Sequence, residues 1–383
     1  MKLRHLWTTL CLLLLPIPLL AQEAQSLGIG SAATASPMGI FSIIWNPSVL
    51  AEPEGVDTAW EIASGFSAFD TSNSGSPIIH FVPNDALGAS QDPISRFQQY
   101  QGLFAVRYLN AAGGVLWNQE LDYLSSQGAL QFFHDRDNNS IGAGSSYSLN
   151  YQQTTQQVAN LVISYGMPLP LGSLQMFSVG GSLKYHDGLQ YEQTSIDGNF
   201  TQGSSPVTFT RTTSSSGLGL SIDLGFFTKL SDALQAGLML ENLQSNFNWQ
   251  AQQQSYVLNQ TNGAESPVGS PTNVTVAAPF PYTTKLGLAM SPPEKNIALE
   301  TEVSWFLHQT RWRVGMQRYY PEANLVVRLG TFSDQVSNQQ MWTFGAGYLI
   351  KNFNVDLSFL TRSIPDLQNS IALGGALDAE VRF

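Results

Sequence analysis

The chain has 383 residues, of which 17 are basic and 28 acidic, so its net charge is −11. An acidic chain has no electrostatic reason to bind nucleic acid, and we expect no nucleic-acid partner. Charged residues make up 12% of the sequence, about half the share found in soluble domains, while 11% are aromatic. After the first 21 residues, no run is apolar over the roughly twenty residues that a spanning helix needs, so the composition favours a transmembrane β-barrel.

Residues 1–21 have the features of a secretory signal peptide. Two basic residues at the start precede an apolar stretch over 10–20, and Ala21 offers a cleavage position. The stretch contains two prolines and is too short to cross a bilayer comfortably, which disfavours the alternative of a retained anchor. The single cysteine, Cys11, lies in this segment, so we expect the mature protein to contain no disulfide, thiolate ligand or catalytic thiol.

Residues 22–56 are predicted to fold into the lumen of the barrel as a plug. Small residues dominate up to position 39 and permit close packing in a confined space. The turn that follows is expected to be fixed, because Pro47 restricts its own φ and disfavours a helical Asn46. A flexible leader is the alternative. The predicted plug motif consists of Gly28, Ala32, Ala33, Trp45, Asn46, Pro47 and Ser48.

Residues 57–383 are predicted to form the barrel as a succession of β-strands. The first strand is expected over 58–69, and the connection after it contains a short predicted helix over 93–100. A second strand is expected over 102–109. Residues 113–152 fit either one long bent hairpin arm or three strands. We therefore predict an all-β, antiparallel transmembrane barrel of about fourteen strands, or sixteen under the second interpretation.

After residue 155, side chains alternate in polarity along every predicted strand. One face is apolar, and the other carries glycine, serine and scattered charges, as expected for strands between two different environments. The polar face is too rich in glycine and too sparsely charged for a solvent-exposed surface, so we assign it to the lumen of a membrane barrel. These strands are predicted at 159–165, 177–185, 218–226, 234–243, 282–290, 297–306, 311–319, 325–332, 342–349, 353–360 and 372–383.

Charged residues on the polar face are predicted to line the lumen. Glu300 and Glu302 lie on one strand of a predicted hairpin. Arg311 and Arg313 should lie opposite them, where opposed charges stabilise strand pairing by roughly 0.2–1 kcal/mol. These four residues could form a polar constriction or a latch for the plug, or they could simply balance the charge of the lumen. The other charges assigned to the lumenal site are Arg328, Asp378, Glu380 and Arg382.

Short and long connections alternate along the predicted barrel. Outer-membrane barrels have short periplasmic turns and longer external loops. This alternation places the C-terminal Phe383 at the periplasmic end. The short connections are predicted at 230–233, 291–296, 321–324 and 350–352, and the long ones at 187–216, 243–281, 333–340 and 361–371.

The segment 26–51 resembles the N-terminal signature of the FadL-like outer-membrane superfamily, and in particular its PorV-type branch. The small-residue run and the Trp-Asn-Pro turn carry the resemblance, and short glycine-based matches such as 237–242 follow through most of the chain. The sequence departs from the branch at Ser48 and Val49, where alanine and glycine are usual. The resemblance implies a plugged, fourteen-stranded barrel in contact with the lipid of a bacterial outer membrane. It also implies that barrel-assembly machinery recognises Phe383 as an assembly signal.

No catalytic constellation stands out, and no histidines have the spacing of metal ligands, so we predict neither enzymatic activity nor a cofactor or metal site. Resemblance to the PorV-type branch implies a secretion-associated partner whose long external loops, 187–216 and 243–281, engage exported proteins or a translocon. The alternative, by resemblance to FadL-type transporters, is a channel in which hydrophobic small molecules enter from outside, pass the plug and leave through the wall. A structural or adhesive surface barrel is a third hypothesis.

Overall fold

The computed structural model describes most of the chain after the predicted signal peptide. Residues 1–21 lie outside the described part, as do nearly all residues of the predicted long connections at 333–340 and 361–371. Within the described part, sixteen strands form one sheet in which every pairing is antiparallel. The described residues are 24–29, 31–36, 39–52, 60–72, 93–170, 176–204, 206–292, 295–306, 309–333, 340–361 and 372–383.

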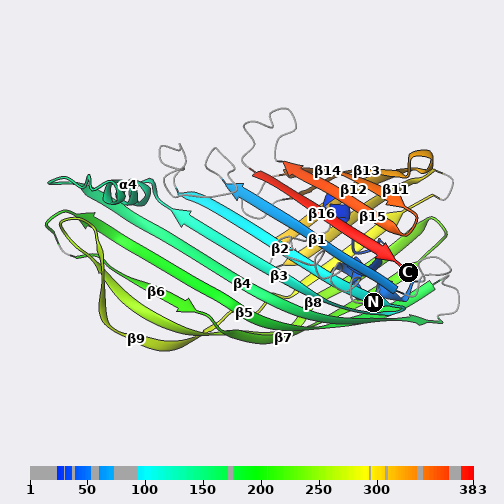
Figure 1. Ribbon diagram of the computed structural model, residues 1–383, viewed down its shortest axis with the longest axis horizontal. Coiled ribbons are helices and arrows are strands. Elements are labelled where there is room, and N and C mark those ends of the chain that lie inside the picture. Colours follow the sequence, from blue (N-terminus) through cyan, green and yellow to red (C-terminus); the bar gives the residue numbers. More distant parts are fainter. Residues whose placement is uncertain are drawn as a thin grey trace, which may run out of the picture.

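Fourteen of the described strands close into a barrel, because the first strand pairs with the last. The predicted fold class and strand number are therefore confirmed. Figure 1 shows the tilted strands around the lumen. They are β1 (Trp60–Ser72), β2 (Ile94–Tyr108), β3 (Ala111–Ser125), β4 (Ser146–Leu169), β5 (Met176–Thr201), β7 (Gly217–Lys229), β8 (Leu234–Leu258), β10 (Thr283–Met290), β11 (Ile297–Phe306), β12 (Gln309–Tyr320), β13 (Leu325–Ser333), β14 (Gln340–Ile350), β15 (Phe353–Thr361) and β16 (Ala372–Arg382).

The wall of the barrel has an apolar outer face and a polar inner face. On β7, for example, Leu218 and Leu220 are 54% and 45% exposed, whereas Ser221 and Asp223 are fully buried. Exposed apolar side chains recur around the wall, on β4, β10, β12 and β15. A continuous apolar belt of this kind is unsuited to water but fits hydrocarbon. The barrel therefore lies in a membrane, with the architecture of bacterial outer-membrane proteins.

Three barrel strands are far longer than a bilayer requires. β4, β5 and β8 have 24, 26 and 25 residues, against the roughly 9–11 that cross a membrane. Their outer ends form an extension, with β6 (Thr208–Ser214) paired to β5 and β8 and β9 (Glu265–Ala277) paired to β8. The extension projects well beyond the rest of the barrel, at the left of Figure 1.

The extension corrects the prediction that 187–216 and 243–281 are polar loops. Both ranges are largely β-structure. Apolar alternation identifies strands only where one face is dry, and much of this sheet carries glutamine, serine and threonine on both faces. These residues pair into a ladder, and the apolar side chains buried among them, such as Ile196 and Phe209, are too scattered to form a regular stripe in the sequence.

Two predictions near the start of the barrel also change. The helix expected over 93–100 is the first half of β2, where residues such as Gln98 pair with Asp70 of β1. The ambiguous range 113–152 contains most of β3, helix α4 (Gln127–Asp137) and the start of β4. Helix α4 begins where the side chain of Ser126 accepts a hydrogen bond from the Ala129 amide, 3.2 Å away.

The short turns predicted at 230–233, 321–324 and 350–352 are confirmed. Asn324 and Lys351 adopt positive φ in the last two turns, a conformation that tight connections use. The C-terminus lies at the same end of the barrel in Figure 1. There, the Phe383 amide donates to the carbonyl oxygen of Trp60 at 2.8 Å, which continues the seam between β1 and β16.

The described part of the N-terminal segment lies inside the barrel, where Figure 1 shows it in dark blue. Buried apolar residues such as Ile29, Phe41 and Trp45 pack against Leu103 and Ala105 of the wall. No helix in the described ranges is long and apolar enough to cross a membrane. The short elements of this segment are α2 (Ala24–Gly28), η1 (Gly39–Phe41), α3 (Ser42–Trp45) and η2 (Pro47–Ala51).

Candidate functional site

Asn46 connects the N-terminal segment to itself and to the barrel wall. Its side-chain amide donates to the carbonyl oxygens of Thr34, at 2.9 Å, and of Phe226 on β7, at 3.1 Å. Its side-chain oxygen, Oδ1, accepts from the backbone amide and the hydroxyl group of Ser48, at 3.2 and 2.6 Å. Pro47 begins η2 directly after it. Hydrogen bonds to the N-terminal segment and to the barrel wall thus hold the predicted turn in place.

Small residues let this segment approach the wall closely. A β-carbon on Gly28 would lie 2.8 Å from the hydroxyl of Ser358, closer than β-carbons are found in proteins. On the wall side, a β-carbon on Gly180 would overlap the backbone of Pro47. Ala32 and Ala33 are buried as well, and Ala33 packs in the cluster formed by Trp45 and its neighbours. Larger side chains at these places would separate the segment from the wall.

Glu302 joins the N-terminal segment to β12. It accepts hydrogen bonds from the Thr34 amide, at 3.2 Å, and from the Thr34 hydroxyl, at 2.5 Å. It also forms an ion pair with Arg313, which lies directly opposite it in the strand register. The position of these two residues agrees with the predicted cross-strand pair.

The other half of the predicted charge cluster is arranged differently. Arg311 lies opposite Ser304, and Glu300 lies opposite Gly315, so these two charges do not face each other. Glu300 instead accepts hydrogen bonds from the Ser36 hydroxyl, at 3.0 Å, and from the Gln317 amide, at 3.3 Å. Two glutamates of β11 therefore hold two neighbouring residues of the N-terminal segment.

The remaining predicted lumenal charges lie near helix α2. Arg328 forms a buried ion pair with Asp356, and Asp378 accepts a long hydrogen bond of 3.4 Å from the Gln25 amide. Glu380 and Arg382 pair with each other along β16, with donor–acceptor distances of 2.9 and 3.2 Å. Phe383 is 61% exposed, and its recognition by barrel-assembly machinery stays a prediction.

A second charge network spans four strands of the wall. Lys184 on β5 lies 2.7 Å from Asp223 on β7 and 3.6 Å from Glu241 on β8. Lys285 on β10 lies 3.0 Å from Glu241, and its ammonium group is 5.0 Å from the centre of the Trp45 ring. Sequence alternation indicates that these residues face the lumen, but it carries no signal for which of them pair. Through Lys285 and Trp45, the network contacts the N-terminal segment.

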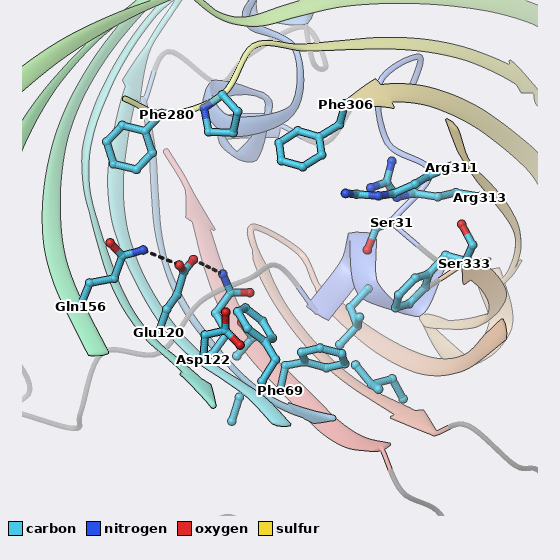
Figure 2. Close-up of a pocket in the computed structure, with 18 of the residues that line it drawn as sticks. Ser31, Phe69, Glu120, Asp122, Gln156, Phe280, Phe306, Arg311, Arg313 and Ser333 are labelled. Atoms are coloured by element: carbon cyan, nitrogen blue, oxygen red, sulfur yellow. Dashed lines mark hydrogen bonds between the residues drawn. The ribbon is translucent and has the colours of Figure 1, made fainter. Parts of the chain in front are cut away.

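A cavity of about 720 Å³ lies in the lumen against the N-terminal segment. Leu27, Ser31 and Trp45 contribute to its lining from that segment. Figure 2 shows the aromatic side chains and charged groups around the open space. Phenylalanines from several strands and one loop dominate the apolar lining, namely Phe69, Phe97, Phe247, Phe280, Phe306 and Phe332.

Charges of opposite sign lie on opposite sides of the cavity. Arg311 and Arg313 reach in from β12, whereas Glu120 and Asp122 reach in from β3 (Figure 2). The Arg311 guanidinium lies 4.7 Å from the centre of the Phe306 ring, a cation–π contact. The cavity thus combines aromatic walls with one basic and one acidic side.

Glu120 is held in place by three side-chain amides. It accepts hydrogen bonds from Gln156 at 2.7 Å, from Asn118 at 2.8 Å and from Gln99 at 2.9 Å. These donors come from β4, β3 and β2, so the acidic side of the cavity is built across three neighbouring strands. Its geometry is therefore fixed before any ligand arrives.

The wall is irregular beside the cavity. The pairing of β7 with β8 shifts register near Asp223, and Asn242 on β8 has a φ of 52°. The Asn242 amide donates to Asp223 at 2.8 Å, and its side chain donates to the Pro281 carbonyl at 3.2 Å. Pro281 belongs to the break between β9 and β10, where Phe280 lies 4.2 Å from the ring centre of His186. Strands β7 and β8 thus lose regular pairing close to the break between β9 and β10.

No protein family and no curated protein matches the sequence. Solved structures do match the fold. The Ralstonia pickettii toluene transporter TbuX has a TM-score of 0.61 and 12% identity, covering 96% of this chain and 100% of its own. The Pseudomonas putida toluene transporter TodX has a TM-score of 0.56 and 13% identity, covering 95% and 99%. A FadL homologue of Pseudomonas aeruginosa has a TM-score of 0.56 and 11% identity, with the same coverage as TodX. At such identities the likeness establishes the fold alone.

Proposed function

We propose that this protein is a non-enzymatic outer-membrane channel for hydrophobic small molecules. The observation that carries the proposal is the aromatic cavity of about 720 Å³ inside the lumen. Ligand sites for small molecules usually have volumes of about 300–1,000 Å³, with mostly apolar walls and a few polar groups. An apolar ligand that loses about 200 Å² of surface to such walls gains on the order of 5 kcal/mol.

The N-terminal segment acts in this proposal as the plug below the cavity. Its contacts through Asn46, Thr34 and Ser36 hold it against the wall, and it must move or loosen for a ligand to pass. The break at 278–282 lies beside the cavity and next to the irregular parts of β7 and β8. It offers a place where a ligand could leave sideways through the wall.

The fold comparison supports transport over secretion. TbuX and TodX are toluene transporters, and their barrels superpose on nearly the whole of this chain. The secretion hypothesis, drawn from the PorV-type resemblance, expected two long external loops to engage partners, but these ranges are mostly paired strands. Association with exported proteins or a translocon, like adhesion, stays a prediction that rests on the sequence alone. Recovery of a stoichiometric secreted partner in a pull-down from outer membranes would favour secretion.

Binding of propylbenzene to the barrel in lipid nanodiscs tests the cavity directly. Phe97 lines the cavity and lies 6.2 Å from Phe69 between ring centres. Because an aromatic contact contributes about 0.5–1.5 kcal/mol, Phe97→Ala should weaken binding roughly threefold to tenfold. Trp45 also lines the cavity, so its fluorescence can report the binding.

The matched control is Phe359→Ala, because Phe359 is a phenylalanine on the outer face and is 54% exposed. This variant should bind propylbenzene as tightly as the unaltered protein. Equal affinities in all three proteins would show that the ligand binds elsewhere and would contradict the proposal.

A further inference from the structure

We infer that the cavity selects aromatic molecules that carry an anionic substituent, and that Arg311 and Arg313 hold that substituent. The inference rests on the proposed function, because it names the class of ligand for the same cavity. It goes further by assigning the two ends of the ligand to two parts of the lining.

Strand β12 brings both guanidinium groups to one side of the cavity. Alternation along the strand directs Arg311 and Arg313 to the lumen, while Trp312 and Val314 are exposed on the outer face. Figure 2 shows the two arginine side chains extending side by side into the open space. Two neighbouring cations thus line a cavity that is also rich in aromatic side chains.

The two arginines are held in place by different contacts. Arg313 is fixed by its ion pair with Glu302 and by a hydrogen bond of 3.0 Å to Ser304. Arg311 lies over the Phe306 ring, which orients the plane of its guanidinium. Removal of Arg313 would also disturb Glu302 and its bonds to Thr34, so Arg311 is the residue with which to test the inference.

The chemistry of guanidinium favours a planar anion. Its N–H groups form a rigid fork that matches a carboxylate with two parallel hydrogen bonds. Such bonds are stronger where water is largely excluded, as between phenylalanine side chains. The rest of the ligand meets rings, including Phe69, Phe97 and Phe332, and aromatic pairs have favourable offset or edge-to-face arrangements.

The acidic side of the cavity gives the ligand one orientation. Glu120 is held by three amide donors and cannot easily turn away, and Asp122 lies beside it in the lining. An anionic substituent is repelled from this side and attracted to β12. A saturated fatty acid would satisfy the arginines but would leave the aromatic lining without a matching ring.

Three probes of similar size test the contributions of the aromatic ring and of the anionic group separately. 4-Propylbenzoate has both the ring and the anion, propylbenzene has only the ring, and octanoate has only the anion. Affinities are measured in nanodiscs for the unaltered protein and for Arg311→Gln. We expect 4-propylbenzoate to bind most tightly, and Arg311→Gln to weaken its binding roughly tenfold or more. Propylbenzene should bind Arg311→Gln unchanged, which also shows that the variant is folded.

Two further variants sharpen the result. Arg318→Gln removes an arginine of the same strand that lies over Tyr320 outside the cavity, and it should change no affinity. Arg311→Lys keeps the charge but loses the planar fork, and it should recover only part of the affinity for 4-propylbenzoate.

The outcomes distinguish this inference from the proposed function. If propylbenzene binds but Arg311→Gln leaves 4-propylbenzoate unaffected, the channel proposal stands and the inference is overturned. Octanoate binding as tightly as 4-propylbenzoate would overturn the requirement for a ring. If none of the three probes binds, the proposed function itself fails, and the inference fails with it.

Discussion

At the scale of single residues, Asn46 shows how a short sequence pattern determines a long-range contact. Asn46 and Pro47 predict a turn, and the structure adds that the Asn46 side chain bridges Thr34 and β7. Because the residue is fully buried, removal of its side chain would leave its two carbonyl partners without a donor. The side chain therefore links the N-terminal segment to the wall at a point that one substitution can test.

Asn46→Ala should loosen the N-terminal segment while the barrel stays intact. The substitution leaves buried acceptors without donors, at a cost of about 1–3 kcal/mol. Hydrogen exchange of the amides in 42–52 should therefore accelerate, with little change in β12 to β15. The control is Asn199→Ala, at an exposed position on the extension. Unchanged exchange in 42–52 would mean that the segment is held mainly by other contacts.

At the scale of elements, the extension is a separate structural unit built on the same strands. Helix α4 packs on it through Phe132 and Phe133, in a buried cluster with Tyr147, Phe200 and Leu258. Phe132 is fully buried, with ring centres 4.9 Å from Phe200 and 5.6 Å from Tyr147. This cluster gives the extension its own hydrophobic core, away from the lumen.

Phe132→Ala should destabilise the extension and not the barrel. Truncation of a buried phenylalanine costs about 3–5 kcal/mol. Limited proteolysis should then cut more rapidly within 126–145, while the membrane-embedded part stays resistant. Gln131→Ala, on the exposed side of the same helix, serves as the control. Unfolding of the whole barrel by Phe132→Ala would show that the two parts are not independent.

The elements also show what alternation can and cannot predict. It placed the strands after 282 within a few residues, because there one face meets lipid and the other meets the lumen. It failed at 187–216 and 243–281, where glutamine, serine and threonine interrupt the apolar positions and only some residues, such as Ile196 and Phe200, are buried on one face. It failed similarly at 93–100, where polar residues precede the membrane-crossing part of β2.

The candidate site was harder to predict than the fold. The ion pair between Glu302 and Arg313 follows from one hairpin register, which short turns make predictable. The network from Lys184 to Lys285 crosses four strands, and the cavity draws on residues from Leu27 to Leu360. Such contacts depend on how the barrel closes and how the N-terminal segment lies inside it, and neither is local in the sequence.

At the scale of the whole molecule, the outer wall, the lumen and the cavity differ in the chemistry of their side chains. Apolar side chains cover the outer wall, ion pairs and glycines line the lumen around the N-terminal segment, and aromatic side chains surround the cavity. This arrangement is consistent with the proposed channel for hydrophobic small molecules. In the proposed channel, the extension stands at the entrance, on the side away from the short turns and the C-terminus.

The most direct test of the account is the rate at which bacterial cells carrying this barrel in their outer membrane take up labelled propylbenzene. Ser67 lines the cavity, and Ser67→Trp should fill part of it. The control is Ser64→Trp, on the outer face of the same strand. All barrels are compared at equal amounts in the outer membrane. We predict several-fold faster uptake with the unaltered and Ser64→Trp barrels than with cells lacking the barrel, and loss of that gain with Ser67→Trp. Equal uptake in all four kinds of cell would contradict the channel proposal.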